Sequence, residues 1–190
     1  MSRSDTRAGT RRTDGVGRRA RTSHRPHRAR ALRLCALVLG AVLGCSGAHF
    51  DGHVFRKGDV AFRLDAVPDD WRPLELTDTA LAFRDEGAGA TVAINGRCGK
   101  DAEDVPLRSL TQHLFLHFTE RNVEQQRTFT LDAREALLSR LDAKLDGVRQ
   151  YFQVVVLKKD GCVYDFLQIA SQPQPEEPFL RFVNGFSSIG

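Results

Sequence analysis

Cysteine thiols are the side chains in this sequence with the clearest chemistry. Cys45 directly follows an uncharged apolar run, residues 34–44, and a thiolate is nucleophilic enough to take a covalent lipid there. Cys35 lies inside the run. If the run is an export signal, Cys98 and Cys162 remain, which predicts a disulfide between them, with two free buried thiols as the alternative. Neither has a second ligand at metal-site spacing, so they predict no metal site.

The charge of the chain is divided sharply at this apolar run. Residues 1–44 contain eleven Arg, no Lys and two acids, for a net charge of +9, whereas 17 of the 28 basic and 22 of the 24 acidic residues follow, for −5. As a helix the run would span roughly 16 Å, too short for a bilayer core of about 30 Å but typical of a signal peptide. The small Gly44 would let a peptidase reach the bond before Cys45.

The segment Val42-Leu43-Gly44-Cys45 resembles the lipobox of bacterial lipoproteins. In that family the cysteine is lipidated on sulfur, the bond before it is cleaved, and the new N-terminus is usually acylated. The resemblance implies a signal peptide over residues 1–44, a lipid on Cys45 and a linker over 45–58. Several acyl chains exceed what stable membrane anchoring requires.

The expected location is therefore the cell envelope. Ser46 after Cys45 resembles the outer-membrane sorting class, which places the protein at the outer membrane, facing the periplasm. An ordinary secretory signal, an uncleaved helix and a basic cytoplasmic tail are the alternatives. Because the chain after Gly44 is acidic, its charge indicates neither a nucleic-acid partner nor binding to anionic lipid.

Residues 59–190 are numerous enough for one domain with one core. The strand-like segments alternate or are rich in β-branched residues, and they are 60–64, 74–76, 81–83, 90–94, 127–130, 137–145, 150–157 and 162–169. Asp-Gly pairs at 146–147 and 160–161 join the last three, which predicts an antiparallel meander. The pattern over 137–145 also fits a helix.

Two helices are expected around these strands. Residues 106–120 have apolar side chains at helical spacing, among them Leu110, Leu114 and Phe118. After a Pro-rich loop, residues 179–186 have the spacing of a short C-terminal helix that docks on the sheet. Strands followed and interrupted by helices define the α+β class.

This order of elements, with the segments 60–64, 142–147 and 162–166, resembles the PsbP/Mog1-type fold. The resemblance implies an α/β/α sandwich, in which helices flank an antiparallel sheet. Members of that fold are mostly binding or assembly factors and share no catalytic residue that could be transferred to this chain. We therefore expect a lipid-anchored, non-catalytic binding or assembly module without a cofactor, attached to the membrane by its lipid and serving an unknown protein partner in the envelope.

Two sets of polar residues offer other chemistry. His113 and His117 would lie on one helical face at a spacing that can bind a metal, with Glu120 as a third ligand. They indicate the alternative function, a small metal-binding protein or metal-dependent enzyme, or else the polar edge of a helix. Asp165 lies between Tyr164 and Phe166, where burial would raise its pKa and make it a functional candidate, unless it pairs with an arginine or faces solvent.

Overall fold

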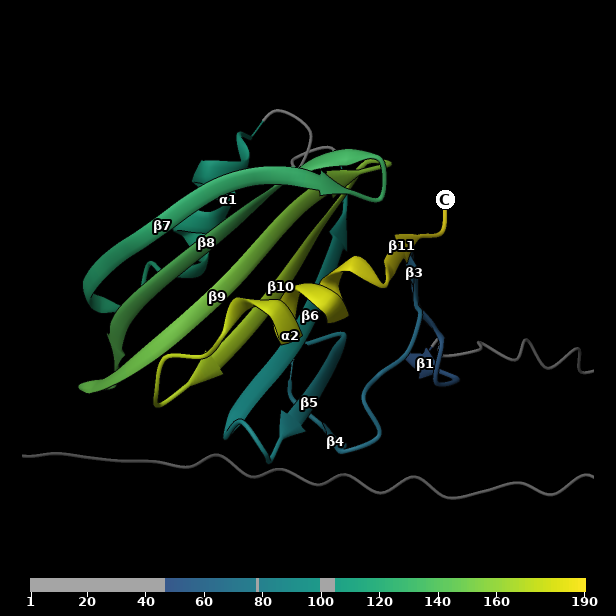
Figure 1. Cartoon of the computed structure of the whole chain (residues 1–190). Helices are drawn as coiled ribbons and strands as arrows, with labels where there is room; N and C mark the ends of the chain where they lie inside the picture. The colour runs from purple at the N-terminus through teal and green to yellow at the C-terminus, as the bar shows by residue number, and fades with distance from the viewer. Residues whose placement is uncertain (1–46, 78, 100–104) are drawn as a thin grey trace, which may run out of the picture. The chain divides into compact units, whose positions relative to one another are not determined.

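An antiparallel sheet of seven strands forms the centre of the computed structural model, which describes residues 47–77, 79–99 and 105–190 (Figure 1). In spatial order its strands are β4 (Trp71–Leu74), β5 (Leu81–Asp85), β6 (Ala90–Cys98), β10 (Cys162–Ala170), β9 (Val148–Lys159), β8 (Arg134–Leu145) and β7 (Thr119–Leu131). A smaller sheet has the order β1 (His49–Phe50), β2 (Val54–Lys57), β3 (Val60–Leu64) and β11 (Phe186–Ser188). The helices are α1 (Leu107–Leu114) and α2 (Glu176–Asn184).

The predicted signal peptide over 1–44, the lipidated Cys45 and the neighbouring Ser46 lie outside the described residues. Within the described ranges, no helix has both the length and the apolar character that crossing a membrane would need.

Each face of the large sheet has its own hydrophobic core. On one face, α2 and the small sheet bury side chains such as Phe179 and Phe55. On the other face, α1 buries Leu110 against Phe152 and its neighbours. Because β9 is covered on both sides, all of residues 152–157 are buried, which explains why apolar side chains lie on both faces of this strand, with Gln153 as the polar exception.

The predicted α+β class is confirmed. The sandwich is confirmed in part, because α1 alone covers one face, whereas α2 shares the other face with the small sheet. The expected meander is also present, since β8, β9 and β10 pair antiparallel through two tight turns. In these turns Asp146, Gly147, Asp160 and Gly161 all have positive φ, the geometry that a two-residue hairpin turn requires.

A third tight turn joins β7 to β8 through Asp132 and Ala133, whose φ angles are 48° and 59°. The sequence did not indicate it, because alanine is unusual in this left-handed conformation, where its Cβ crowds the backbone. The Asp132 carboxylate secures the turn by accepting hydrogen bonds from the Ser188 backbone N–H and hydroxyl and by pairing with Lys159. Burial raises the pKa of Asp132, but these hydrogen bonds outweigh it and the net pKa is lowered.

Ala133→Gly should therefore raise the free energy of unfolding, by roughly 0.5–1 kcal/mol, because glycine relieves the left-handed strain at little steric cost. Urea denaturation measures the change. As a matched control, Ala61→Gly in β3, where φ is not positive, should lower the free energy of unfolding by about the same amount. If both substitutions destabilise equally, the turn is not strained as described.

Cys98 and Cys162 form the predicted disulfide. They lie directly opposite each other in the pairing of β6 with β10, with their Cα atoms 4.0 Å apart. The bond joins the first half of the large sheet to the meander, and Cys162 is itself part of the core.

Several boundaries differ from the sequence expectations. The strand expected over 74–76 lies at Trp71–Leu74, and the one expected over 127–130 is the last part of the longer β7. Part of the predicted linker over 45–58 forms β1 and β2, because Phe55 completes the core with Phe62. The helix expected over 106–120 ends at Leu114, where backbone N–H groups begin to donate three residues back and tighten the chain before β7. Phe186, expected in the last helix, lies in β11 and reaches the core from there.

Candidate functional site

A groove of about 420 Å³ lies between α1 and β7, on the face of the large sheet that α1 covers. We call it the α1–β7 groove. Its lining residues come from α1 and the turn after it, from β7 and from β8, and they are Thr111, Gln112, Phe115, Leu116, Arg121, Val123, Gln126, Ser139 and Leu141. The volume is within the range of about 300–1,000 Å³ that is typical of ligand sites.

Aromatic packing fixes the helical wall of the groove. Phe115 packs on Phe118 and on Phe152 of β9, with ring centroids 5.2 and 5.4 Å apart, and Phe118 stacks on Phe152 at 5.0 Å. Within α1, the Thr111 hydroxyl donates to the Leu107 carbonyl oxygen, 2.9 Å away. The end of α1 is thus held against the sheet, and the position of the wall does not depend on a ligand.

The rim of the groove is apolar and exposed. Leu116 and Val123 are 63% and 55% exposed, although both are large apolar side chains. Leu116 faces the groove from the turn after α1, and Val123 faces it from β7. The buried Leu141 lies in the floor below them. Covering these side chains would remove apolar surface from water, which favours association.

The polar groups in the groove are cationic or neutral. Arg121 donates to the Phe115 carbonyl oxygen at 3.3 Å, and Arg108 of α1 donates to Gln126. Gln126 in turn donates to the Ser139 hydroxyl at 3.0 Å. The described lining contains no Asp or Glu, so no carboxylate of the lining would repel an anionic group there.

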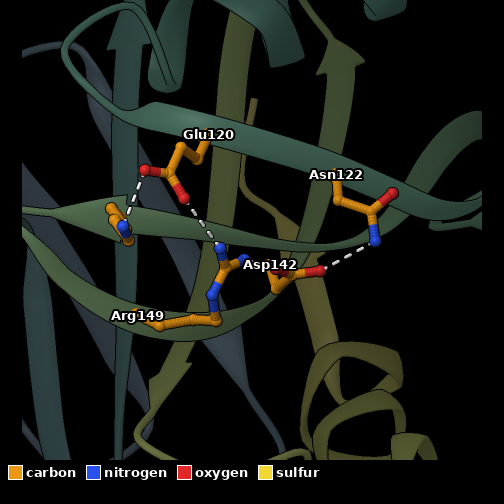
Figure 2. A network of polar contacts seen from close by, with 5 residues as sticks. Glu120, Asn122, Asp142 and Arg149 are labelled. Atoms are coloured by element: carbon orange, nitrogen blue, oxygen red, sulfur yellow. Dashed lines mark hydrogen bonds and ion pairs between the residues drawn. The ribbon is translucent and has the colours of Figure 1, made fainter.

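A polar network on the opposite face of β7 holds this stretch of strand in place (Figure 2). Asp142 of β8 accepts hydrogen bonds from Asn122, at 2.9 Å, and from Arg149 of β9. Glu120 pairs with Lys144 at 2.6 Å and with Arg149 at 3.1 Å. The hydrogen bond from Lys144 is the largest cause that lowers the pKa of Glu120. Alternate residues of β7 thus serve the network and the groove.

β7 is also an edge strand, and its start is irregular. The register with β8 shifts between Thr119 and Asn122 and again between Val123 and Gln125. Glu120 has a φ of 48°, which is uncommon for a glutamate and fits a bulge. Bulges and charged side chains protect a free edge from pairing with another strand. The irregular start of β7 is therefore poorly suited to pairing with a further strand.

The residues of the alternative metal site do not share one helical face. His113 lies in the last turn of α1, His117 lies beyond its end, and Glu120 belongs to β7, where it binds Lys144 and Arg149. In the part of the chain that the structure describes, no group of three or more His, Cys, Asp or Glu is placed to hold a metal ion. The prediction of a helix through Glu120 was wrong because β7 begins at Thr119.

Asp165 is buried, with 2% of its surface exposed, on the face that α1 covers. Its Oδ2 atom pairs with the half-exposed Arg97 of β6. Its Oδ1 atom and the Oδ1 atom of Asn95, which lies opposite it in the strand register, are buried and have no hydrogen-bond partner among the described residues. Burial raises the pKa of Asp165, and the charge of Arg97 offsets this only in part.

Asp165→Asn should make the stability less dependent on pH. Because the folded-state pKa is raised, the folded protein binds this proton more tightly than the unfolded chain, so the stabilisation is complete below the ordinary pKa of 3.8 and is lost as pH rises through the raised value. Urea denaturation across a pH series should show the native protein losing stability relative to Asp165→Asn over this range. Arg97→Gln should steepen the loss. Parallel pH profiles for all three proteins would contradict the assignment.

The groove was not evident from the sequence. Its residues come from elements that become neighbours only through the pairing of β7 with β8. The one available signal was Leu116, an apolar residue within the helix expected over 106–120 but outside its apolar face.

Comparisons with known proteins establish the fold and nothing finer. No family model and no curated protein matches the chain. A crystal structure from Bacteroides thetaiotaomicron is similar with a TM-score of 0.53 at 8% identity, over 74% of this chain and 50% of that one. The chain thus spans half the length of the Bacteroides protein.

A second similar structure is the cyanobacterial PsbP protein, CyanoP, of Synechocystis sp. PCC 6803. The TM-score is 0.51 at 11% identity, over 77% of this chain and 99% of CyanoP. LpqN of Mycobacterium tuberculosis, described as involved in cell envelope biogenesis, has a TM-score of 0.46 at 16% identity, over 68% of this chain and 83% of LpqN, which is too low to carry an argument. The predicted PsbP-like fold is supported by the likeness to CyanoP.

Proposed function

We propose that this protein is a lipid-anchored envelope protein that acts as a non-catalytic binding or assembly module. In this proposal Cys45 carries the lipid at the outer membrane, and the α1–β7 groove receives a segment of a protein partner in the periplasm. The segment presents a large apolar side chain next to a carboxylate. The anchor is supported by the lipobox-like Val42-Leu43-Gly44-Cys45.

One observation favours the α1–β7 groove as the binding site. Leu116 and Val123 leave large apolar side chains in water beside the Arg121 guanidinium, within a wall and floor that are already ordered. An apolar side chain would cover the two residues, and a carboxylate would meet a guanidinium in a charge-assisted hydrogen bond. Burying this rim needs no rearrangement of the fold, which favours binding.

Site-specific photo-crosslinking in intact cells tests the proposal. A photoreactive phenylalanine analogue at position 116 or 123 should give a discrete protein adduct. The analogue at Leu76 or Val148, which are 47% and 60% exposed outside the groove, should not. Arg121→Glu in the same chain should remove the groove adduct by repelling the partner's carboxylate.

Three results would contradict this site. Equal adducts at groove and control positions would indicate unspecific contact. Adducts with lipid alone would make the groove a lipid site. An adduct that forms equally well in the Arg121→Glu variant would show that Arg121 does not bind a carboxylate of the partner. Because Leu116 is mostly exposed, Leu116→Glu should leave the free energy of unfolding within about 0.5 kcal/mol, so that a loss of binding in that variant is not a loss of fold.

A further inference from the structure

The small sheet begins very close in sequence to the proposed lipid. β1 starts at His49, and only three residues separate it from Cys45. Four residues span at most about 14 Å when fully extended. The headgroup layer on one side of a bilayer is itself about 5–8 Å thick. If Cys45 is lipidated, the small sheet is therefore held at the membrane surface.

The two faces of the small sheet differ in chemistry. One face is buried in the core through Phe55, Phe62 and Leu64. The register places the alternate residues on the outer face, and they are His49, Val54, Arg56, Ala61, Arg63 and Ser187. We call this set the outer face of the small sheet. It combines two arginines and a histidine with small or apolar residues and contains no acid.

The arginines of this face are available to a ligand. Arg56 and Arg63 are exposed, and neither forms an ion pair with any described residue. Three exposed acids lie just beyond the strand ends, and they are Asp51, Asp59 and Asp65. Asp51 is engaged there, since its carboxylate accepts the backbone N–H groups of Val54 and His53 at 2.7 and 2.8 Å.

We propose that the outer face of the small sheet rests on anionic lipid headgroups, with Arg56 and Arg63 binding lipid phosphates. The proposal rests on the proposed lipid anchor at Cys45. Guanidinium groups bind phosphate in a forked geometry, and small neighbours leave the two arginines free to approach a flat surface. The occupant is thus a bilayer, because the tether keeps no other anionic surface so close.

The net charge of −5 after Gly44 does not oppose this contact. At physiological salt, exposed charges farther than about 8 Å away are largely screened, so only the face that touches the headgroups counts. The tether also makes the contact intramolecular and raises its effective concentration. Loss of each arginine should weaken the contact about fivefold.

The contact would also orient the candidate site. The small sheet packs on one face of the large sheet, and the α1–β7 groove opens on the other. With the small sheet on the bilayer, the groove faces away from the membrane and toward partners in the periplasm.

The test uses the chain from Cys45 onward, which contains both cores and every described strand. With Cys98 and Cys162 joined, Cys45 is its only free thiol, so it can be coupled to a maleimide lipid in vesicles. Paramagnetic headgroup lipids then broaden the amide signals of residues near the surface. This chemical tether makes the result independent of whether cells lipidate Cys45.

In vesicles containing phosphatidylglycerol, β1, β2 and β3 amides should broaden and α1 amides should not. Arg56→Glu with Arg63→Glu should reduce the broadening to the level in phosphatidylcholine vesicles, whereas Arg108→Glu with Arg121→Glu, the same charge change on the other face, should not. Equal broadening in both lipids, broadening centred on α1, or no effect of the Arg56/Arg63 change would overturn the proposal. Failure of lipidation in cells would instead overturn the anchor.

Discussion

Replacing both Cys98 and Cys162 with alanine should lower the free energy of unfolding by about 4 kcal/mol. The disulfide closes a loop between residues 64 positions apart, and in the chain-entropy account a loop of this length restricts the unfolded chain by about that amount. The bond changes the free energy of the folded protein less than that of the unfolded chain, because Cys98 and Cys162 are already opposite each other in adjacent strands. Urea denaturation of the oxidised protein and the variant measures the difference.

The matched control is the native protein under reducing conditions, in which the same two side chains remain as thiols. It should lose nearly as much stability as the alanine variant, since the loss comes from the unfolded chain and not from packing of sulfur. A difference below about 1 kcal/mol between oxidised and reduced protein would contradict the entropic account. A large loss in the variant alone would mean that Cys162 contributes mainly through its place in the core.

Asp142→Ala should cost about 2 kcal/mol and should loosen the start of β7 in particular. Asp142 is 7% exposed and accepts hydrogen bonds from Asn122 and Arg149, and removing a buried charged acceptor leaves its donors without that partner. The loss of stability stays moderate because Arg149 is partly exposed to water and still pairs with Glu120. Thermal or urea unfolding gives the overall change, and amide hydrogen exchange locates it.

Exchange should accelerate over β7 near Asn122 more than in β9 or β10, and the groove adducts at position 123 should weaken with it. Glu120→Ala is the control, since Glu120 is exposed at the outer end of the same network and surface ion pairs contribute about 0–1 kcal/mol. If Glu120→Ala destabilises as strongly as Asp142→Ala, the buried carboxylate is not the centre of the network.

The meander was predictable because its information is local. Asp146-Gly147 and Asp160-Gly161 favour left-handed turn residues, and the strand between them, β9, contains the apolar run 154–157. The turn at Asp132-Ala133 was not predictable, since nothing local favours alanine at positive φ; the contacts that Asp132 makes with Ser188 and Lys159, far along the chain, hold it.

Local sequence patterns could not predict where the helices end or which residues form the candidate site. Phe118 has the spacing of a residue on the apolar face of a longer helix, but it packs on Phe152 from outside α1. Its spacing therefore led to a helix that was too long. The disulfide could be predicted from the number of cysteines alone, because two cysteines remain once Cys35 and Cys45 are assigned to the signal peptide and the lipid. Burial of Asp165 and its pairing with an arginine were both among the possibilities from the sequence, but Arg97 is brought to it only by the pairing of β6 with β10.

The central claim, a binding module held to the membrane at Cys45, is tested most directly by the intact mass of the protein extracted from cell membranes. We predict a chain that begins at Cys45, carries a diacylglyceryl group on sulfur and an acyl chain on its N-terminus, and contains the Cys98–Cys162 disulfide. Cys45→Ser should remain an unprocessed precursor without lipid. A chain in the membrane that still begins at Met1, or one cleaved elsewhere without lipid, would contradict the account.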